Sequence, residues 1–263
     1  MRDGNVVVPG ARLWHRDTGG LGTPIIFLHA GFGHAEYFED HQLPLFAAAG
    51  YRAIVYDRRG HGHTRIDASG EAPVTAVDDL QAVVDDLDLD LDRFHLIGTA
   101  AGGIVATDYA LTHPGRLRSM VIANSIVGVE DLDYLEVARS LRPAEFEKLP
   151  VYFKELGPEY RAANPEGVAR WRDIEQRTRP AGPIARTQAP RNRITFAALE
   201  TIGVPVLFIA GDADLYSPPT LLKRVAAHMS EAQFVSLRAV GHSAYWEQPD
   251  AFNRLVLDFI GRH

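Results

Sequence analysis

The sequence contains no cysteine, carries no excess of positive charge and has no long hydrophobic run. The absence of cysteine excludes disulfides, thiolate metal sites and a cysteine nucleophile, and it suits a reducing compartment. A net charge of −7 argues against nonspecific binding to nucleic acid. No apolar run reaches the roughly 18 residues of a membrane span, and the first residues contain no signal-peptide core. We therefore expect a cytoplasmic protein that binds neither nucleic acid nor membranes.

The chain has 263 residues, of which 46% are hydrophobic and 23% are charged, enough for one large domain with a sizeable core. Short apolar runs alternate with helical patterns of period 3.6. The expected strands are 12–15, 25–29, 53–56, 94–97, 119–123, 204–210 and 234–237, and the expected helices include 35–49, 75–87, 218–228 and a C-terminal helix through Phe252 and Ile260. This alternation predicts an α/β fold with a doubly wound, mostly parallel sheet.

The pattern changes between residues 127 and 200, where strand-like runs disappear and seven prolines interrupt helical segments. Strand and helix patterns then resume. The sequence therefore predicts a core formed by 1–126 and 201–263, with a helical cap, 127–200, inserted over the carboxyl edge of the sheet.

The stretch from Phe94 to Val105 reads as a strand, a turn of small residues and a helix. Its turn, Gly98-Thr99-Ala100-Ala101-Gly102, has the spacing of a nucleophile elbow, Gly-x-Ser-x-Gly, in which a strained turn lifts a serine off the end of a strand. Alanine occupies the serine position. A methyl group cannot attack a carbonyl, so the position designed for a nucleophile has none.

Two further loops after predicted strands carry residues suited to acyl transfer, Gly211-Asp212-Ala213-Asp214 and Val240-Gly241-His242. The carboxyl ends of parallel strands meet at one edge, so these loops can converge on the elbow. With His29-Ala30-Gly31-Phe32-Gly33 and Tyr56-Asp57-Arg58-Arg59-Gly60-His61-Gly62, the order of motifs resembles the α/β-hydrolase superfamily over nearly the whole chain. The resemblance implies the α/β-hydrolase fold and a serine hydrolase with a helical cap.

By this resemblance His242 is the general base and acid, and Asp214 holds its second ring nitrogen. Asp212 is the competing acid, although it also fits a turn cap. The oxyanion hole would comprise the N–H groups of Ala101 and Gly31, with Phe32 as the neighbouring choice for the second. No metal or organic cofactor is implied. His29 and Asp57 are expected to support the loops, and His61 and His63 lack partners at metal-ligand spacing.

Three hypotheses account for Ala100. In the first, alanine replaces the serine of an active parent, leaving a site that binds substrate without turning it over. In the second, the protein is a natural non-hydrolytic member in which His242 and Asp214 transfer protons, as in a lyase or a cofactor-free oxygenase. In the third, the pocket is a ligand-binding receptor site. We favour the first, because the other motifs of the reaction are retained.

The expected substrate is a small molecule, an ester or lactone, with cleavage of a carbon–carbon bond as the less favoured reaction. The predicted cap holds eight arginines against three acids between residues 161 and 193: Arg161, Arg170, Arg172, Arg177, Arg179, Arg186, Arg191 and Arg193 against Glu166, Asp173 and Glu175. A basic cap suits a carboxylate-bearing substrate, although the arginines also fit a solvated helix surface. We predict that Phe32, Trp171 and Arg161 contact the substrate. A homodimer through the cap or an edge strand is compatible with the sequence.

Overall fold

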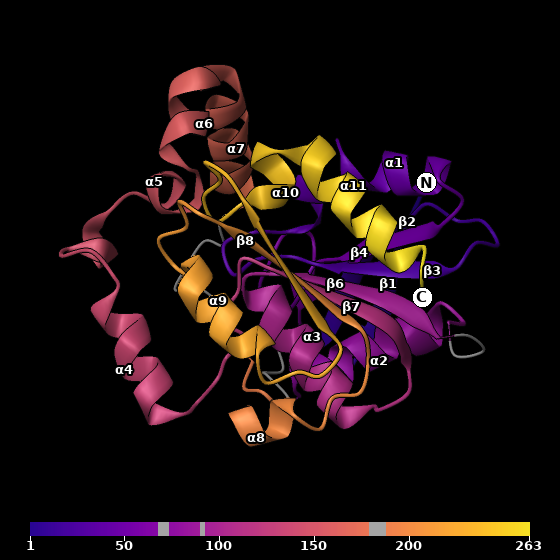
Figure 1. Ribbon diagram of the computed structural model, residues 1–263. Helices are drawn as coiled ribbons and strands as arrows, with labels where there is room; N and C mark the ends of the chain where they lie inside the picture. Colours follow the sequence, from indigo (N-terminus) through magenta and orange to yellow (C-terminus); the bar gives the residue numbers. More distant parts are fainter. Residues whose placement is uncertain (68–73, 90–92, 179–187) are drawn as a thin grey trace.

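The computed structural model describes residues 1–67, 74–89, 93–178 and 188–263 (Figure 1). In these residues one sheet of nine strands has the order β1-β2-β4-β3-β6-β7-β8-β9, with β5 beside β2. The strands are β1 (Arg2–Val8), β2 (Ala11–Asp17), β3 (Pro24–Leu28), β4 (Arg52–Tyr56), β5 (Arg65–Ile66), β6 (Phe94–Thr99), β7 (Leu117–Ala123), β8 (Val206–Gly211) and β9 (Ala232–Leu237).

From β4 to β9 every neighbouring pair of strands is parallel, which confirms the predicted fold class. The strand order reverses at β3 and β6, because the chain leaves β3 for β4 and returns to the other side of β3 as β6. Ligands bind beyond the carboxyl ends of strands at such a switch point. The loop after β3 and the elbow after β6 therefore lie side by side.

The N-terminal hairpin was not predicted. β1 contains Asp3, Gly4 and Asn5, which disfavour strands, yet it pairs antiparallel with β2 along its whole length. A bidentate ion pair between Arg16 and Asp3, 2.7 and 2.9 Å, ties the two strands together. Pairing with β2 thus outweighs the weak local preference.

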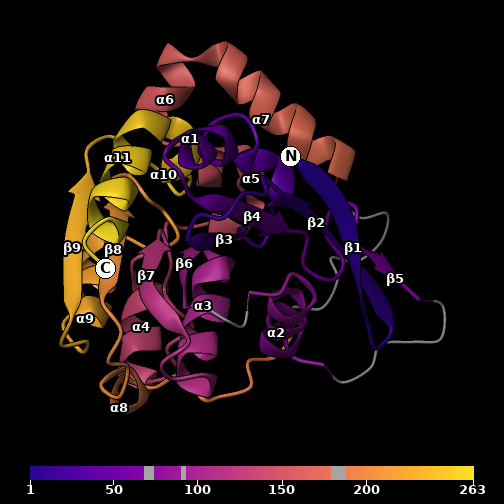
Figure 2. The same cartoon turned by 90° about the vertical axis from the view of Figure 1, so that its right-hand side faces the viewer.

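Helices cover both faces of the sheet (Figure 2). One hydrophobic cluster joins it to α2 (Ala76–Asp86), α3 (Ala101–Thr112) and α9 (Pro219–Ala226). The other joins the opposite face to α1 (Gln42–Ala48), α10 (Ala244–Glu247) and α11 (Pro249–Ile260). The predicted helix 35–49 is instead a short 3₁₀ turn η1 (Ala35–Phe38) followed by α1. Pro44 explains the break, because it is tolerated in the first turn of α1 but not inside one continuous helix.

Between β7 and β8 the described residues form helices and no strand: α4 (Leu132–Ser140), η2 (Phe146–Lys148), α5 (Val151–Glu155), α6 (Pro158–Ala163), α7 (Pro165–Thr178) and α8 (Phe196–Leu199). Prolines mark helix starts, as in α6 and α7. Arg179 and Arg186 of the predicted basic cluster lie outside the described residues. No helix in the described part of the chain is both long and apolar enough to cross a membrane.

Candidate active site

The turn between β6 and α3 has the strained backbone of a nucleophile elbow. Ala100 adopts φ 49° and ψ −115°, a conformation that costs a residue with a Cβ about 1–3 kcal/mol. The turn closes only because its flanking residues are glycines. A Cβ on Gly98 would lie 2.5 Å from the Gly102 carbonyl oxygen, and one on Gly102 would lie 2.2 Å from the Leu28 carbonyl oxygen. The sequence pattern and the geometry therefore agree at this turn.

Hydrogen bonds hold Ala100 at the carboxyl end of β6. Its N–H donates to the Ala123 carbonyl at 2.9 Å, and its carbonyl accepts from the Ser125 hydroxyl at 2.6 Å. Its side chain is only a methyl group, and this methyl faces the cavity that His242 also lines.

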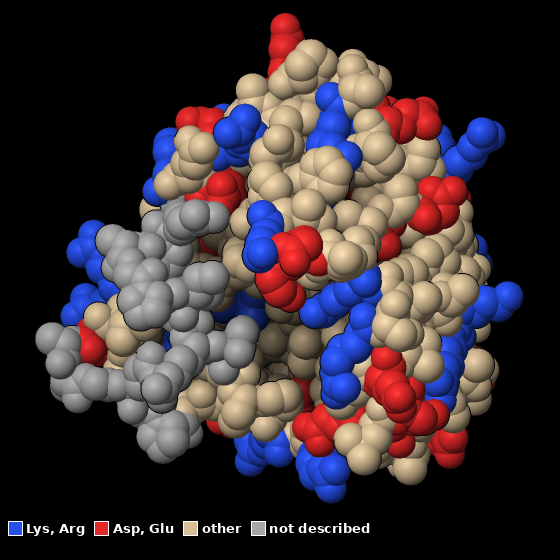
Figure 3. All heavy atoms as spheres, turned by 90° about the vertical axis from the view of Figure 1, so that its left-hand side faces the viewer, with Lys and Arg blue, Asp and Glu red and all other residues tan. Residues whose placement is uncertain are grey.

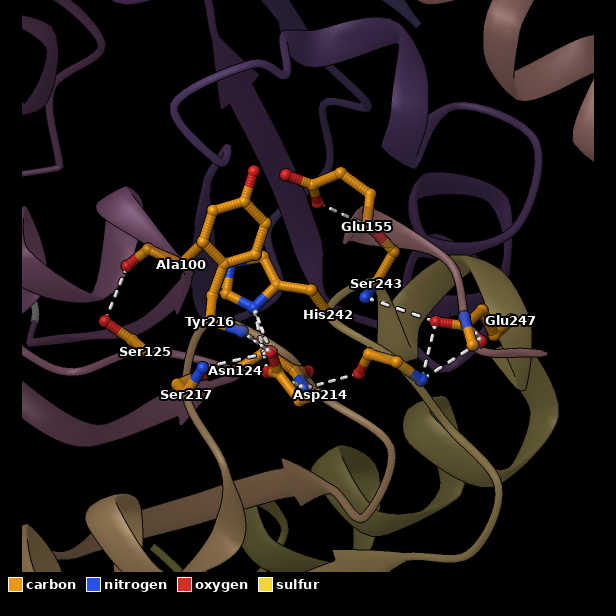
Figure 4. A network of polar contacts seen from close by, with 12 residues as sticks. Ala100, Asn124, Ser125, Glu155, Asp214, Tyr216, Ser217, His242, Ser243 and Glu247 are labelled. Atoms are coloured by element: carbon orange, nitrogen blue, oxygen red, sulfur yellow. Dashed lines mark hydrogen bonds and ion pairs between the residues drawn. The ribbon is translucent and has the colours of Figure 1, made fainter. Parts of the chain in front are cut away.

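His242 and Asp214 form a buried pair beside the elbow (Figure 4). The ring nitrogen Nδ1 lies 2.8 Å from Oδ2 and 2.9 Å from Oδ1 of Asp214. An ionised carboxylate only accepts hydrogen bonds, so Nδ1 carries the proton and Nε2 is left for the cavity. Asp212 takes no part, because its carboxylate accepts the Ala239 N–H at 2.6 Å in a turn.

Asp214 is held by donors besides His242: the N–H groups of Tyr216 and Ser217, at 2.8 and 3.0 Å, the Ser217 hydroxyl, at 2.7 Å, and Asn124 Nδ2, at 3.1 Å. Burial alone would raise the pKa of this carboxyl, but the charge of His242 and these bonds lower it to about 2. Asp214 therefore stays ionised beside the ring.

The pKa of His242 moves the other way. Burial would lower it, but the carboxylates of Asp214 and Glu155 outweigh burial and raise the pKa to about 9. In the Ala100 chain the ring is consequently an imidazolium at neutral pH.

The loop that carries His242 is fastened to the segment between α5 and α6. The His242 N–H donates to the Glu155 carbonyl at 2.8 Å, and the buried Glu247 carboxyl accepts from the N–H groups of Gly157 and Gly241, at 2.8 and 2.9 Å. Gly241 is required here, since a Cβ on it would lie 2.4 Å from the Gly157 nitrogen. Burial raises the pKa of Glu247 to about 7 despite these donors.

Gly31 lies against the elbow, because a Cβ built on it would be 3.6 Å from the Ala101 Cβ. The carbonyl groups of its loop are occupied: Ala30 accepts from the His29 ring at 2.7 Å, and Gly31 accepts from the His61 ring at 2.9 Å. In contrast, the N–H groups of Gly31, Phe32 and Ala101 donate to no residue in the described part of the chain.

Arg58 braces this loop from behind. Its guanidinium is buried and donates from Nη2 to the carbonyls of His29 and Ala30, both at 3.0 Å. Its backbone N–H donates to Nε2 of His29, so the other ring nitrogen carries the proton that reaches the Ala30 carbonyl. Because a peptide unit is planar and trans, fixing the Ala30 carbonyl also fixes the direction of the Gly31 N–H.

A cavity of about 120 Å³ opens at Ala100. It is lined by Ala100, Ala101, Ile104, Asn124, Ser125, Ile126, Arg142, Tyr216, Ser217 and His242. The elbow, the loops after β7 and β8 and the histidine loop thus line the cavity together, and Arg142 adds the segment after α4. Tyr216 lies against His242 with ring centroids 4.5 Å apart.

Sequence reasoning missed several of these residues. Asn124 and Ser125 directly follow a predicted strand, which is the signal that singled out Asp214. Tyr216 and Ser217 follow Asp214 in an Asp-x-Tyr-Ser turn, where an Asp side chain commonly accepts nearby N–H groups. Arg142 has no comparable local signal.

The three residues predicted to contact substrate do not line the cavity. Trp171 is buried in the hydrophobic cluster with Tyr37, at a ring distance of 5.6 Å. Arg161 donates to the carbonyls of Phe153 and Leu156, so its guanidinium is already engaged. Phe32 is half-buried beside Gly31 but lies outside the cavity lining.

The described residues contain no cluster of three or more His, Asp or Glu side chains that could hold a metal ion. His29 and His61 bond to the loop around Gly31, as described above. His63 Nδ1 lies 3.3 Å from Asp57, whose carboxylate also accepts the Ala35 N–H at 2.8 Å. These side chains therefore support loops.

Comparison with known proteins matches residues 25–255 to the alpha/beta hydrolase family. The 2-hydroxy-6-oxononadienedioate/2-hydroxy-6-oxononatrienedioate hydrolase of Cupriavidus pinatubonensis is 28% identical over 95% of this chain and 91% of its own. The enol-lactonase of Burkholderia xenovorans has a similar fold, with a TM-score of 0.79, 24% identity and coverage of 98% and 100% of the two chains. A bromoperoxidase of Bacillus anthracis has a TM-score of 0.80 at 20% identity, covering 99% and 100%.

Proposed function

Because the chain belongs to the alpha/beta hydrolase family, we propose that its site is built for serine-hydrolase chemistry on a small ester or lactone. With alanine at position 100, this chain binds such a substrate and does not turn it over. One observation carries the proposal: a strained elbow presents position 100 to a cavity shared with a histidine that a buried aspartate orients.

The proposed reaction needs a hydroxyl at position 100. Its oxygen attacks the substrate carbonyl carbon while its proton passes to Nε2 of His242, and Asp214 stabilises the imidazolium that forms. His242 then gives that proton to the leaving oxygen as the ester or lactone bond breaks. A water molecule, deprotonated by the same nitrogen, attacks the acyl-enzyme and restores the hydroxyl.

The N–H groups of Ala101 and Gly31 are proposed to hold the oxyanion, with the Phe32 N–H as the neighbouring donor. Each such donor contributes about 3–4 kcal/mol to acyl transfer. Their freedom from other acceptors and the contact between Gly31 and Ala101 support the assignment. Since they belong to the backbone, alanine at position 100 leaves them in place.

The strain at Ala100 supports the view that alanine replaces a serine. A backbone cost of this kind is retained where it positions a reacting group, and a methyl group gains nothing from it. The non-hydrolytic and receptor alternatives leave the strained turn without a use.

The test is Ala100→Ser, assayed on a panel of short-chain esters and lactones. In another serine hydrolase, loss of the serine lowers kcat by about 2 × 10⁶, so the gain here should be of that order. The matched control is Ala100→Ser with His242→Asn, which should abolish the gain. If Ala100→Ser hydrolyses no ester or lactone, the serine-hydrolase assignment is wrong and proton-transfer or receptor roles replace it.

A further inference from the structure

Two basic side chains stand on the cap side of the cavity. Arg142 lines it directly, and Lys154, in α5, lies behind Tyr216, another lining residue. The side chains of Arg142 and Lys154 both stack on Phe146, each 5.1 Å from its ring centroid. Figure 3 shows this side of the molecule, where basic and acidic side chains stand together at the rim of a hollow.

Lys154 is buried without a counter-charge in contact. The residue is only 6% exposed, yet its ammonium donates to no residue in the described part of the chain. Its near neighbours are the rings of Phe146 and Tyr216, the latter 5.8 Å away. Its Nζ is not one of the fully buried polar atoms without a partner, so the ammonium keeps some access to solvent while its stem is covered. It is therefore able to pair with an anion that binds beside it.

Arg142 also lacks a strong ion-pair partner. Its only described ion pair is with Glu147, at 3.5 Å, and the Glu147 side chain is 81% exposed. An exposed ion pair of this length contributes little. The guanidinium therefore remains available to a ligand in the cavity.

The other described arginines between residues 161 and 193 do not share this property. Most are paired at the surface or stacked on a ring: Arg170 with Asp40, Arg177 with Glu36 and Asp173, Arg191 with Asp78, Arg193 with Glu130, and Arg172 over Tyr152. Arg161 is engaged by two carbonyls. The basic character predicted for the cap is thus concentrated, at the cavity, in Arg142 and Lys154.

The acids near the cavity are mostly engaged elsewhere. Asp214 is matched by His242, Glu155 is bonded to the Ser243 hydroxyl at 3.2 Å, and Glu247 accepts backbone N–H groups. Of the described carboxylates, only the exposed Glu147 pairs with Arg142, and none pairs with Lys154.

We propose that Arg142 and Lys154 form a subsite for a carboxylate, and that the substrate is a small ester or lactone bearing a free carboxylate. A guanidinium fork matches a carboxylate in two parallel hydrogen bonds, and the ammonium adds a compact second charge. The cavity of about 120 Å³ is lined by both Ala100 and Arg142, so a carboxylate bound at Arg142 lies close to the carbonyl that reacts at position 100. This inference rests on the proposed function for the identity of the reacting bond.

The test uses the chain as it is, since Ala100 permits binding without turnover. Monoethyl succinate and ethyl butyrate are matched in size and differ by one carboxylate. Isothermal titration calorimetry at pH 7 should show monoethyl succinate binding roughly 10- to 100-fold more tightly, as expected for hydrogen bonds to charged groups.

Arg142→Gln and Lys154→Met should each reduce that ratio of affinities toward one, by up to about tenfold. Arg161→Gln is the matched control and should keep the ratio. Arg142 is partly exposed, so its replacement is tolerated even if Lys154→Met fails to fold. Equal binding of the two esters, or a ratio that Arg142→Gln leaves intact, overturns the subsite.

Failure of the subsite and failure of the proposed function give different results. If Ala100→Ser hydrolyses ethyl butyrate and monoethyl succinate with equal kcat/KM, the hydrolase assignment stands and the subsite is wrong. If the Ala100 chain prefers monoethyl succinate but Ala100→Ser hydrolyses neither ester, the subsite stands and the hydrolase assignment is wrong.

Discussion

The two walls of the cavity differ in how their charges are satisfied. On the core wall, Asp214 accepts hydrogen bonds from a ring, a hydroxyl, an amide and two backbone N–H groups. The segment between β7 and β8 provides the opposite side, which we name the cap wall. There the lining residue Arg142 meets only an exposed carboxylate, and Lys154, beside the lining residue Tyr216, donates to no residue in the described ranges. A polar group whose hydrogen bonds are all made is held in one geometry, whereas a charged group without a partner is able to bind a ligand. The core wall thus suits the proposed reaction, and the cap wall suits the proposed recognition of a carboxylate.

The origin of the two walls in the chain explains this difference. Core-wall residues lie in the turns and loops just beyond β6, β7, β8 and β9, so the register of the sheet largely fixes where they lie. Cap-wall residues come from the segment after α4 and from α5, which reach the cavity through docking of helices. Recognition can therefore change with the residues after α4, whereas Glu155 and Gly157 of the same inserted segment also hold the loop of His242.

The largest effect expected of a second change, made in the Ala100→Ser background, tests the core wall. With Ala100→Ser as background, Asp214→Asn should lower kcat by about 10⁴, because an amide donates to Nδ1 and leaves His242 in the wrong tautomer. Steady-state kinetics on a short-chain ester measures it. Asp212→Asn is the control and should change kcat little, since Asp212 caps a turn. Equal losses in the two variants would contradict the assignment of Asp214.

A smaller effect is expected from Arg58, which fixes the loop of Gly31. In the same background, Arg58→Met should lower kcat by roughly 10- to 100-fold, less than the loss of an oxyanion donor itself, because the Gly31 N–H is loosened and not removed. The substrate KM should change little. Single-turnover kinetics measures the acylation rate directly.

The neighbouring Arg59 provides the control, since it is equally buried but pairs with Asp79 at 2.7 Å. Arg59→Met leaves a buried carboxylate without its cation and should cost about 3–5 kcal/mol of stability. Urea unfolding separates the two roles. If Arg58→Met loses stability and keeps its kcat, Arg58 is structural and does not act on the loop.

Much of the core wall could be predicted from the sequence, because its signals are local. Glycines at fixed spacing around position 100 and polar residues after apolar runs identify the elbow, Asp214 and His242. The fold class follows from the same alternation. The hairpin of β1 could not be predicted, since pairing with β2 and not local preference forms it.

The cap wall could not be predicted, because no pattern within the chain records where its helices dock. An arginine such as Arg161 looks no different in sequence from Arg142, yet one bonds to carbonyls and the other lines the cavity. Trp171 shows the same limit, since a cap aromatic fits a pocket wall and a core equally well. Its burial against Tyr37 decides the matter.

The smallest expected effect links the two walls through Glu155, which stands on the opposite side of His242 from Asp214 (Figure 4). His242 must be neutral to accept a proton, so kcat/KM of Ala100→Ser should rise with pH toward about 9, the pKa to which the carboxylates of Asp214 and Glu155 raise it against burial. Glu155→Gln keeps an acceptor for Ser243 but removes one carboxylate, which lowers the pKa of His242 and moves the rise to lower pH. Glu147→Gln, on an exposed cap carboxylate, should leave the profile in place. The measurement is the pH dependence of kcat/KM for all three proteins. If the rise stays at the same pH in Glu155→Gln, the Glu155 carboxylate does not affect the pKa of His242, and the two walls are not electrostatically coupled.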